Sequence, residues 1–215
     1  GVDMTRFFPA PPRQDLQIKL GINPADKVFL FMGTLFRFSG LTELITELAP
    51  ALRNDPSLKF LILGDGENSE RLMQLADTLK LRNQVIMPGR IEYDLLADYL
   101  RLGHVALLPF KQELVTHGAL PGKALQYLAS GLPTIATSLD GLMSMVPSGQ
   151  GVIYVQDLAQ LASESLNLLL SDERRIELSK LGRASICDSC NWEQQIELFT
   201  NTLIRTTHLK DNKKC

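Results

Sequence analysis

The sequence has few of the residues that mark metal, disulfide or redox proteins. Among its 215 residues are three cysteines, three histidines and one tryptophan. Cys187 and Cys190 form a lone C-x-x-C, and Cys215 ends the chain. Zinc sites usually need a second ligand pair, redox pairs usually follow a strand, and the histidines are too scattered for a local metal motif. We therefore expect no bound metal and two ordinary thiols at positions 187 and 190.

The chain also lacks a strong net charge and a long hydrophobic run. Its 22 basic and 24 acidic residues give a formal charge of −2, so nothing attracts it generally to nucleic acid or an anionic membrane. The longest apolar stretch, 28–36, is interrupted by Gly33 and Thr34 and is too short to span a bilayer. The first nine residues lack the charged and apolar regions of a signal peptide. The expectation is a cytoplasmic globular protein with one sizeable core.

Short apolar runs alternate with helical patterns along most of the chain. The runs predict six strands, at 27–33, 58–63, 84–87, 104–108, 134–137 and 152–155. Apolar residues at helical spacing predict helices at 41–52, 69–79, 93–102, 122–130, 158–170, 172–187 and 192–205, and a weak one at 14–21. Residues 138–151 are expected to be a loop.

This alternation predicts an α/β fold, a Rossmann-like, doubly wound parallel sheet of about six strands followed by C-terminal helices. We expect a lead-in segment at 1–26, one domain at 27–206 and a polar tail at 207–215.

Glycines and one arginine follow the first two predicted strands, where a sheet of this kind binds its ligands. Gly33 ends the first strand, and Gly64 and Gly66 follow the second. They either let a ligand approach the backbone or only form tight turns. Arg37, in the first loop, is either a cation for an anionic ligand or an ordinary surface arginine.

Residues 64–69 invite a second interpretation, a nicotinamide site. They hold the first two glycines of G-x-G-x-x-G, but Ser69 replaces the third, and the motif follows the second strand rather than the first. No acidic residue ends the next strand to bind a ribose. An oxidoreductase is therefore disfavoured.

The start of the helix predicted at 122–130 has the chemistry of an anion site. Pro121 pre-sets the helix start, and Gly122 exposes backbone N–H groups there. Lys123 adds a full charge that opposes the helix dipole, so an adjacent phosphate would compensate it. The alternative is a merely solvated lysine.

Six segments, in order and spacing, resemble the C-terminal domain of GT-B-fold retaining glycosyltransferases of the group 1 (family 4) type. They are residues 1–9, 61–66, 85–89, 126–137, 149–153 and 191–193. The resemblance implies the donor-binding half of an enzyme that transfers a sugar from a nucleotide diphosphate, most often UDP, to an acceptor hydroxyl. It also implies no obligatory metal and an N-terminal acceptor-binding domain outside this chain.

The resemblance also assigns residue roles. Helix-start amides around Leu120 to Lys123, including Pro121 and Gly122 in that turn, hold the diphosphate, and Gly33 leaves room for the phosphates. Gly64 and Gly66 are assigned to the donor-binding site. Backbone at Arg90 and Ile91 meets the base, and Gln126 meets the ribose. Lys123 and Arg37 supply the catalytic positive charge.

The chain departs from the family where Gly118 and Gln126 replace two glutamates and Ser39 replaces a lysine. These departures motivate an alternative, a non-catalytic binding or scaffold module.

The last predicted helix has two possible packing partners. Trp192, Phe199, Leu203 and Ile204 either contact the missing N-terminal domain, as the resemblance implies, or cap this sheet. If exposed, they would favour self-association.

Overall fold

The computed structural model describes residues 1–111, 116, 118, 121–187 and 190–211. Its centre is a six-stranded sheet of order β3-β2-β1-β4-β5-β6, in which every neighbouring pair is parallel. The strands are β1 (Lys27–Met32), β2 (Leu58–Leu63), β3 (Val85–Gly89), β4 (Val105–Leu108), β5 (Thr134–Thr137) and β6 (Val152–Val155). The predicted doubly wound parallel sheet is confirmed.

The strands are rich in apolar residues because both faces of the sheet are buried. In β1, Leu30 and Met32 join one hydrophobic cluster, whereas Phe29 and Phe31 join the cluster on the opposite face. Successive side chains of a strand point to opposite faces, so a run without polar residues supplies both clusters at once.

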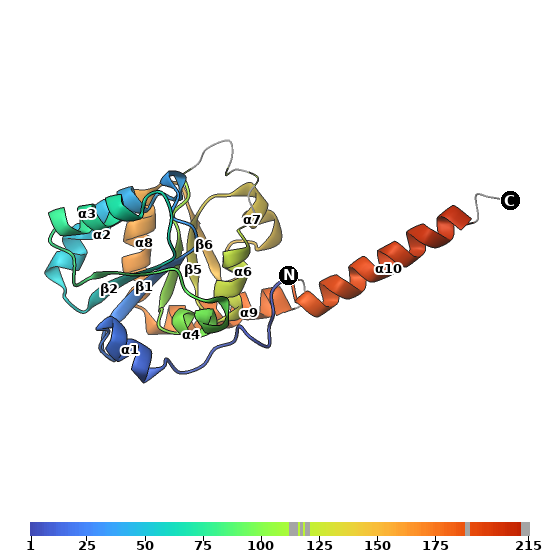
Figure 1. Ribbon diagram of the computed structural model, residues 1–215, viewed down its shortest axis with the longest axis horizontal. Helices are drawn as coiled ribbons and strands as arrows, with labels where there is room; N and C mark the ends of the chain where they lie inside the picture. The colour runs from blue at the N-terminus through green and yellow to red at the C-terminus, as the bar shows by residue number, and fades with distance from the viewer. Residues whose placement is uncertain (112–115, 117, 119–120, 188–189, 212–215) are drawn as a thin grey trace.

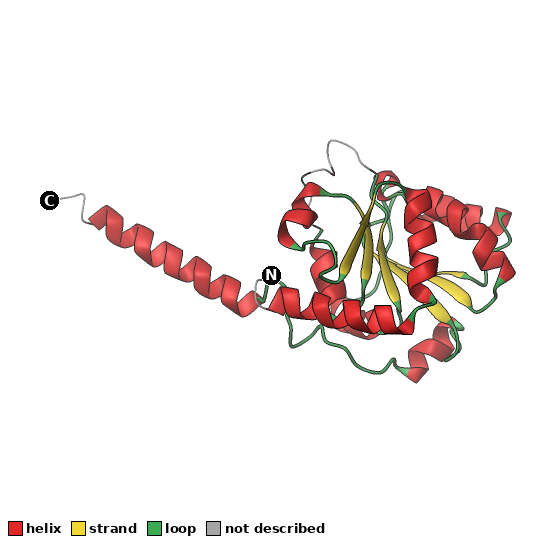
Figure 2. Cartoon of the chain, turned by 180° about the vertical axis from the view of Figure 1, so that it is seen from behind, coloured by secondary structure: helices red, strands yellow, loops and turns green. Residues whose placement is uncertain are grey.

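Helices cover both faces, as Figures 1 and 2 show. One face carries α4 (Leu96–Leu100), α6 (Gly122–Ala129) and α7 (Asp140–Met145), and the other carries α2 (Leu41–Asn54), α3 (Ser69–Thr78) and α8 (Leu158–Leu169). The described residues also form α1 (Gln14–Leu20), α9 (Asp172–Cys187), α10 (Trp192–Asp211) and the short 3₁₀ turns η1 (Arg37–Ser39) and η2 (Tyr93–Leu95).

The helical pattern was misread in two places. Helix α7 occupies part of the segment for which we expected a loop. The sequence pattern did not predict this helix because Leu142 is its one buried side chain, and a single apolar residue gives no periodicity. The helix expected at 93–102 divides into η2 and the five-residue α4.

Helix α10 extends away from the body of the domain (Figure 1). Trp192, Phe199 and Leu203 are 53%, 65% and 50% exposed. The interpretation that this helix caps the sheet is therefore wrong, and its contact with an N-terminal domain stays a prediction. Within the described part of the chain, none of the helices combines the length and apolarity of a bilayer-spanning helix.

The topology marks one place on the sheet for a ligand. From β1 the chain winds outward through β2 and β3, then returns to place β4 on the other side of β1. The connections on the two sides of this point run in opposite directions, which leaves a crevice outside the carboxyl ends of β1 and β4.

Candidate functional site

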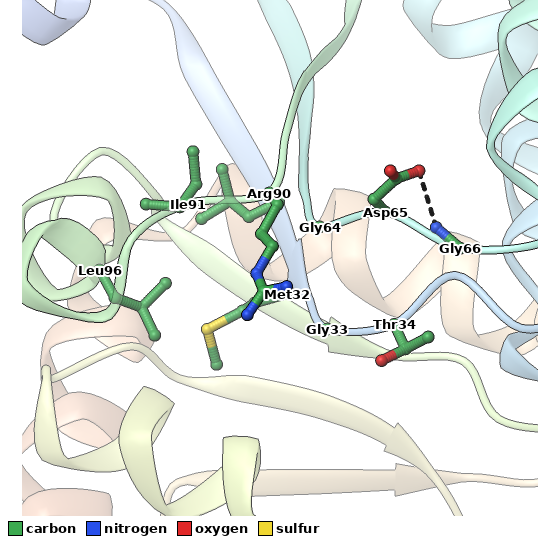
Figure 3. A pocket seen from close by; sticks show the side chains of 10 residues that line it. Met32, Gly33, Thr34, Gly64, Asp65, Gly66, Arg90, Ile91 and Leu96 are labelled. Carbon is green, nitrogen blue, oxygen red and sulfur yellow. Dashed lines mark hydrogen bonds between the residues drawn. The ribbon is translucent and has the colours of Figure 1, made fainter.

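A groove of three adjoining pockets runs along the carboxyl ends of the strands. The first pocket, of about 600 Å³, is lined by Met32, Gly33, Thr34, Leu63, Gly64, Asp65, Gly66, Arg90, Ile91 and Leu96 (Figure 3). The second, of about 530 Å³, shares Met32, Gly33, Thr34 and Leu96 with it and adds Lys123, Gln126, Tyr93 and three phenylalanines. The third, of about 430 Å³, shares Tyr93, Lys123 and Gln126 with the second and reaches Trp192. The groove crosses the switch point between β1 and β4.

Lys123 is the charged group at the centre of this groove. Its Nζ lies 4.5 Å from the ring centre of Phe31 and 5.1 Å from that of Phe110. A Cβ added at Gly33 would stand 2.2 Å from the same nitrogen, so the ammonium rests directly on the glycine backbone.

The ammonium of Lys123 has lost water without gaining an anionic partner among the described residues. Burial lowers its pKa to about 8, and no carboxylate of the described residues offsets that burial. A partly buried cation without a counter-charge is costly, and an anion in the groove would relieve that cost.

Tyr127 fixes α6, and with it Lys123, to the end of β1. Its fully buried Oη accepts a hydrogen bond from the Met32 N–H at 2.6 Å and donates to the Met32 carbonyl at 3.3 Å. Lys123 and Tyr127 are four residues apart and so share a helix face. The contact sets the position of the ammonium over Gly33.

Tyr127→Phe should lower the free energy of unfolding by about 2 kcal/mol, because the buried Met32 N–H would lose its partner. Urea denaturation measures the change. The matched control is Tyr93→Phe, since the Tyr93 side chain is more than half exposed. Equal stability of the two variants would contradict this role for Tyr127.

The glycines of the first pocket are explained by two loops in close contact. The Gly33 N–H donates to the Leu63 carbonyl at 2.8 Å, and a Cβ at Gly64 would stand 2.0 Å from the Gly33 oxygen. A Cβ at Gly66 would stand 2.7 Å from the Leu35 nitrogen. Gly64 and Gly66 line the groove, but backbone packing is what requires them to be glycines; only Gly33 lies against the lysine.

Arg90 is the second cation of the groove and lies in the first pocket. Its exposed side chain extends from the end of β3 into the pocket, and Ile91 lies beside it (Figure 3). The Asp65 carboxylate accepts hydrogen bonds from the Gly66 N–H at 2.8 Å and the Ser69 hydroxyl at 2.5 Å, and these bonds lower the pKa of Asp65. The first pocket therefore contains the cation of Arg90, and the second contains the cation of Lys123.

The structure brings most, though not all, of the predicted site residues together. Pro121 caps α6 and Gly122 begins it, and a Cβ at Gly122 would meet no atom of the described residues within 4 Å. Gln126 is half-buried beside Lys123. Arg37 is exposed on η1, outside the lining of the three pockets, and Leu120 lies outside the described residues.

Our sequence reasoning missed the aromatic lining of the second pocket: Phe36, Phe38, Tyr93 and Phe110. The pair of phenylalanines in a loop that follows a strand was the available signal. Among the described residues, no group of three His, Cys, Asp or Glu side chains is arranged to hold a metal ion.

The sequence and the fold both match known glycosyltransferases. Residues 12–185 match the family model for glycosyl transferases group 1. A D-inositol 3-phosphate glycosyltransferase from Segniliparus rotundus is 26% identical over an alignment of 201 residues that covers 90% of this chain and 43% of that protein. One from Kineococcus radiotolerans is 28% identical over 194 residues, with 81% and 43% covered. The chain thus spans less than half the length of these curated relatives.

Solved structures share the fold at low sequence identity. The C-terminal domain of a glycosyl transferase group 1 family protein from Francisella tularensis superposes with a TM-score of 0.74 at 20% identity, covering 89% of this chain and 100% of that one. Sucrose-phosphate synthase from Thermosynechococcus elongatus gives 0.81 at 24% identity, with 98% and 52% covered. The Anabaena protein HepE in complex with UDP and glucose gives 0.81 at 17%, with 95% and 55% covered.

The family match excludes the nicotinamide interpretation of residues 64–69, since it covers that segment and most of the chain. The six-stranded parallel sheet is one Rossmann-like half of a GT-B fold. The chain belongs to the group 1 glycosyltransferases and corresponds to their C-terminal domain.

Proposed function

We propose that this chain is the donor-binding domain of a retaining glycosyltransferase, which moves a sugar from a nucleoside diphosphate to an acceptor hydroxyl. The observation that carries the proposal is the Lys123 ammonium, which is desolvated, has no counter-charge among the described residues and faces a groove at the switch point of the sheet. Family membership supports the reaction class. The HepE complex with UDP and glucose supports uridine as the base.

In such a transfer the bond between the anomeric carbon and the diphosphate breaks, and negative charge grows on the leaving diphosphate. Lys123 and the free N–H groups at the start of α6 lie where they can stabilise that charge. Arg37 lies outside the lining of the groove, so a part for it in this step rests on the sequence resemblance alone. Arg90 and Ile91 line the first pocket but not the second and are assigned to the base, and Gln126 is assigned to the ribose hydroxyls.

The acceptor and the groups that position it are assigned to an N-terminal domain outside this chain. The relatives are more than twice as long as the matched segment, which leaves room for such a domain. On this account the isolated chain binds nucleotide but transfers no sugar.

A non-catalytic module is the second candidate. Gly118 occupies the position of a family glutamate, and a Cβ there would meet no atom of the described residues within 4 Å. Packing against the described part of the chain therefore does not account for this glycine, and a lost catalytic contact would.

Calorimetric titration with UDP, GDP and ADP separates the two candidates. A donor domain binds one of them preferentially, and that preference identifies the base. A scaffold that has lost the site should bind none of the three nucleotides at millimolar concentration. That result would contradict the donor-domain proposal.

Binding should also depend on pH through Lys123. Its pKa is about 8 in the free chain, and an adjacent diphosphate favours the charged form. Nucleotide affinity should level off toward pH 7.5 and fall about tenfold per pH unit above the pKa, because the lysine must take up a proton to bind. Titrations between pH 7.5 and 9.5 test this, because the nucleotide phosphates stay fully ionised there. A flat profile would show that the ammonium does not meet the ligand.

A further inference from the structure

Three phenylalanines form one wall of the second pocket. Phe36 and Phe38 stack with ring centres 4.8 Å apart and planes 16° from parallel, and the ring of Phe110 lies 6.2 Å from that of Phe38. Phe110 in turn lies 5.1 Å from the Lys123 Nζ. The Phe110 end of this aromatic wall is therefore adjacent to the Lys123 ammonium.

The backbone holds this wall in place. The Ser39 hydroxyl donates to the Phe36 carbonyl at 2.5 Å, and the Lys111 N–H donates to the Phe38 carbonyl at 2.9 Å. The second bond ties the loop after β1 to the segment after β4. Phe36 nevertheless stays 41% exposed, so a large apolar ring is kept in water at the mouth of the groove.

The order of groups along the groove places the wall on the sugar side of the phosphates, which rests on the proposed function. Tyr93 and Leu96 join the second pocket from the segment that follows Arg90 and Ile91, the end assigned to the base. The phenylalanines come from the loops after β1 and β4. Gly33 and Lys123 line the same pocket, so a diphosphate bound there has its base toward Arg90 and its sugar toward the phenyl rings.

A wall of phenyl rings discriminates between sugar substituents. A hydroxyl placed against it loses its hydrogen bonds to water and gains none, which is costly. A methyl group at the same place gains from burial. We propose that this subsite selects a donor sugar that carries a methyl group, as a 6-deoxy sugar or an N-acetylated sugar does.

Sugar 1-phosphates test the subsite without any contribution from the base. Dissociation constants for the α-1-phosphates of glucose, 6-deoxyglucose and N-acetylglucosamine are measured by ligand-observed NMR, with a nucleoside diphosphate as competitor. At least one methyl-bearing sugar should bind about tenfold more tightly than glucose 1-phosphate. Its methyl protons should receive the strongest saturation transfer from the protein. Whichever of the two methyl-bearing sugar phosphates binds more tightly than glucose 1-phosphate identifies the donor as a 6-deoxy or an N-acetylated sugar.

Matched substitutions assign the preference to the wall. Phe36→Ser should reduce it to about twofold or less. Phe8→Ser should leave it unchanged, because Phe8 is also 41% exposed but packs under Arg101, outside the groove.

Two failures remain distinguishable. If nucleoside diphosphates bind but neither methyl-bearing sugar phosphate exceeds glucose 1-phosphate, the subsite inference is overturned and the donor-domain proposal stands. If no nucleotide and no sugar phosphate binds, both are overturned.

Discussion

Lys123→Met should weaken nucleoside diphosphate binding about 30-fold, because a charge-assisted hydrogen bond to phosphate contributes about 2 kcal/mol. Methionine has a similar length and fills the same space between Phe31, Phe110 and Gly33. The loss would therefore report the charge rather than a cavity.

The same substitution should make the ligand-free chain more stable at pH 7. The pKa of Lys123 falls from 10.5 to about 8 on folding, so the folded chain disfavours the ammonium. One pKa unit corresponds to about 1.4 kcal/mol, which puts the gain at up to about 3 kcal/mol. The penalty is complete below pH 8 and disappears as the pH rises to 10.5, so the advantage of Lys123→Met should shrink over that interval.

Calorimetry and urea denaturation of the same samples measure these opposite effects. Lys19→Met is the matched control, since Lys19 is exposed in the last turn of α1, and it should change neither property. Unchanged nucleotide affinity in Lys123→Met would remove the main support for the site. A loss of stability would show that the ammonium has a favourable partner in the free chain.

Gly64→Ala should lower the free energy of unfolding by about 3 kcal/mol or more, from backbone strain and a backbone clash together. Gly64 has φ +133°, a backbone conformation that residues with a side chain rarely adopt. A Cβ added there would stand 2.0 Å from the Gly33 oxygen. Relief requires Gly33 to move, and Gly33 supports the Lys123 ammonium. Nucleotide affinity should therefore fall as well.

Gly122→Ala provides the comparison. Gly122 starts α6, has no positive φ, and leaves open space for a Cβ. Alanine there should leave the urea midpoint unchanged or raise it. If Gly64→Ala were no less stable than Gly122→Ala, the close contact between the two loops would not be the reason for Gly64.

The sheet was predictable because burial on both faces favours unbroken apolar runs, as in residues 28–32. Lys123 was predictable because a lysine in a first helical turn opposes the dipole unless something compensates it. The inclusion of Arg37 among the site cations was not supported by the groove, since proximity in sequence to a strand end does not fix where a loop side chain points.

The aromatic wall could not be predicted, because it depends on tertiary contact. Phe38 and Phe110 lie in segments far apart in the sequence, and only the placement of β4 beside β1 brings them together. Tyr127 was missed for the same reason: its bonds to Met32 link a helix to a strand almost a hundred residues earlier.

Backbone amide NMR of the labelled chain, titrated with UDP, GDP and ADP, tests the central claim most directly. The account predicts that one nucleotide shifts the amides of Gly33, Ile91 and Gly122, which line the groove at the carboxyl ends of the strands. The amides of Gly21 and Asn83, beside a separate pocket of about 410 Å³, should stay unchanged. Shifts confined to that second region, or no shifts with any nucleotide, would contradict the account.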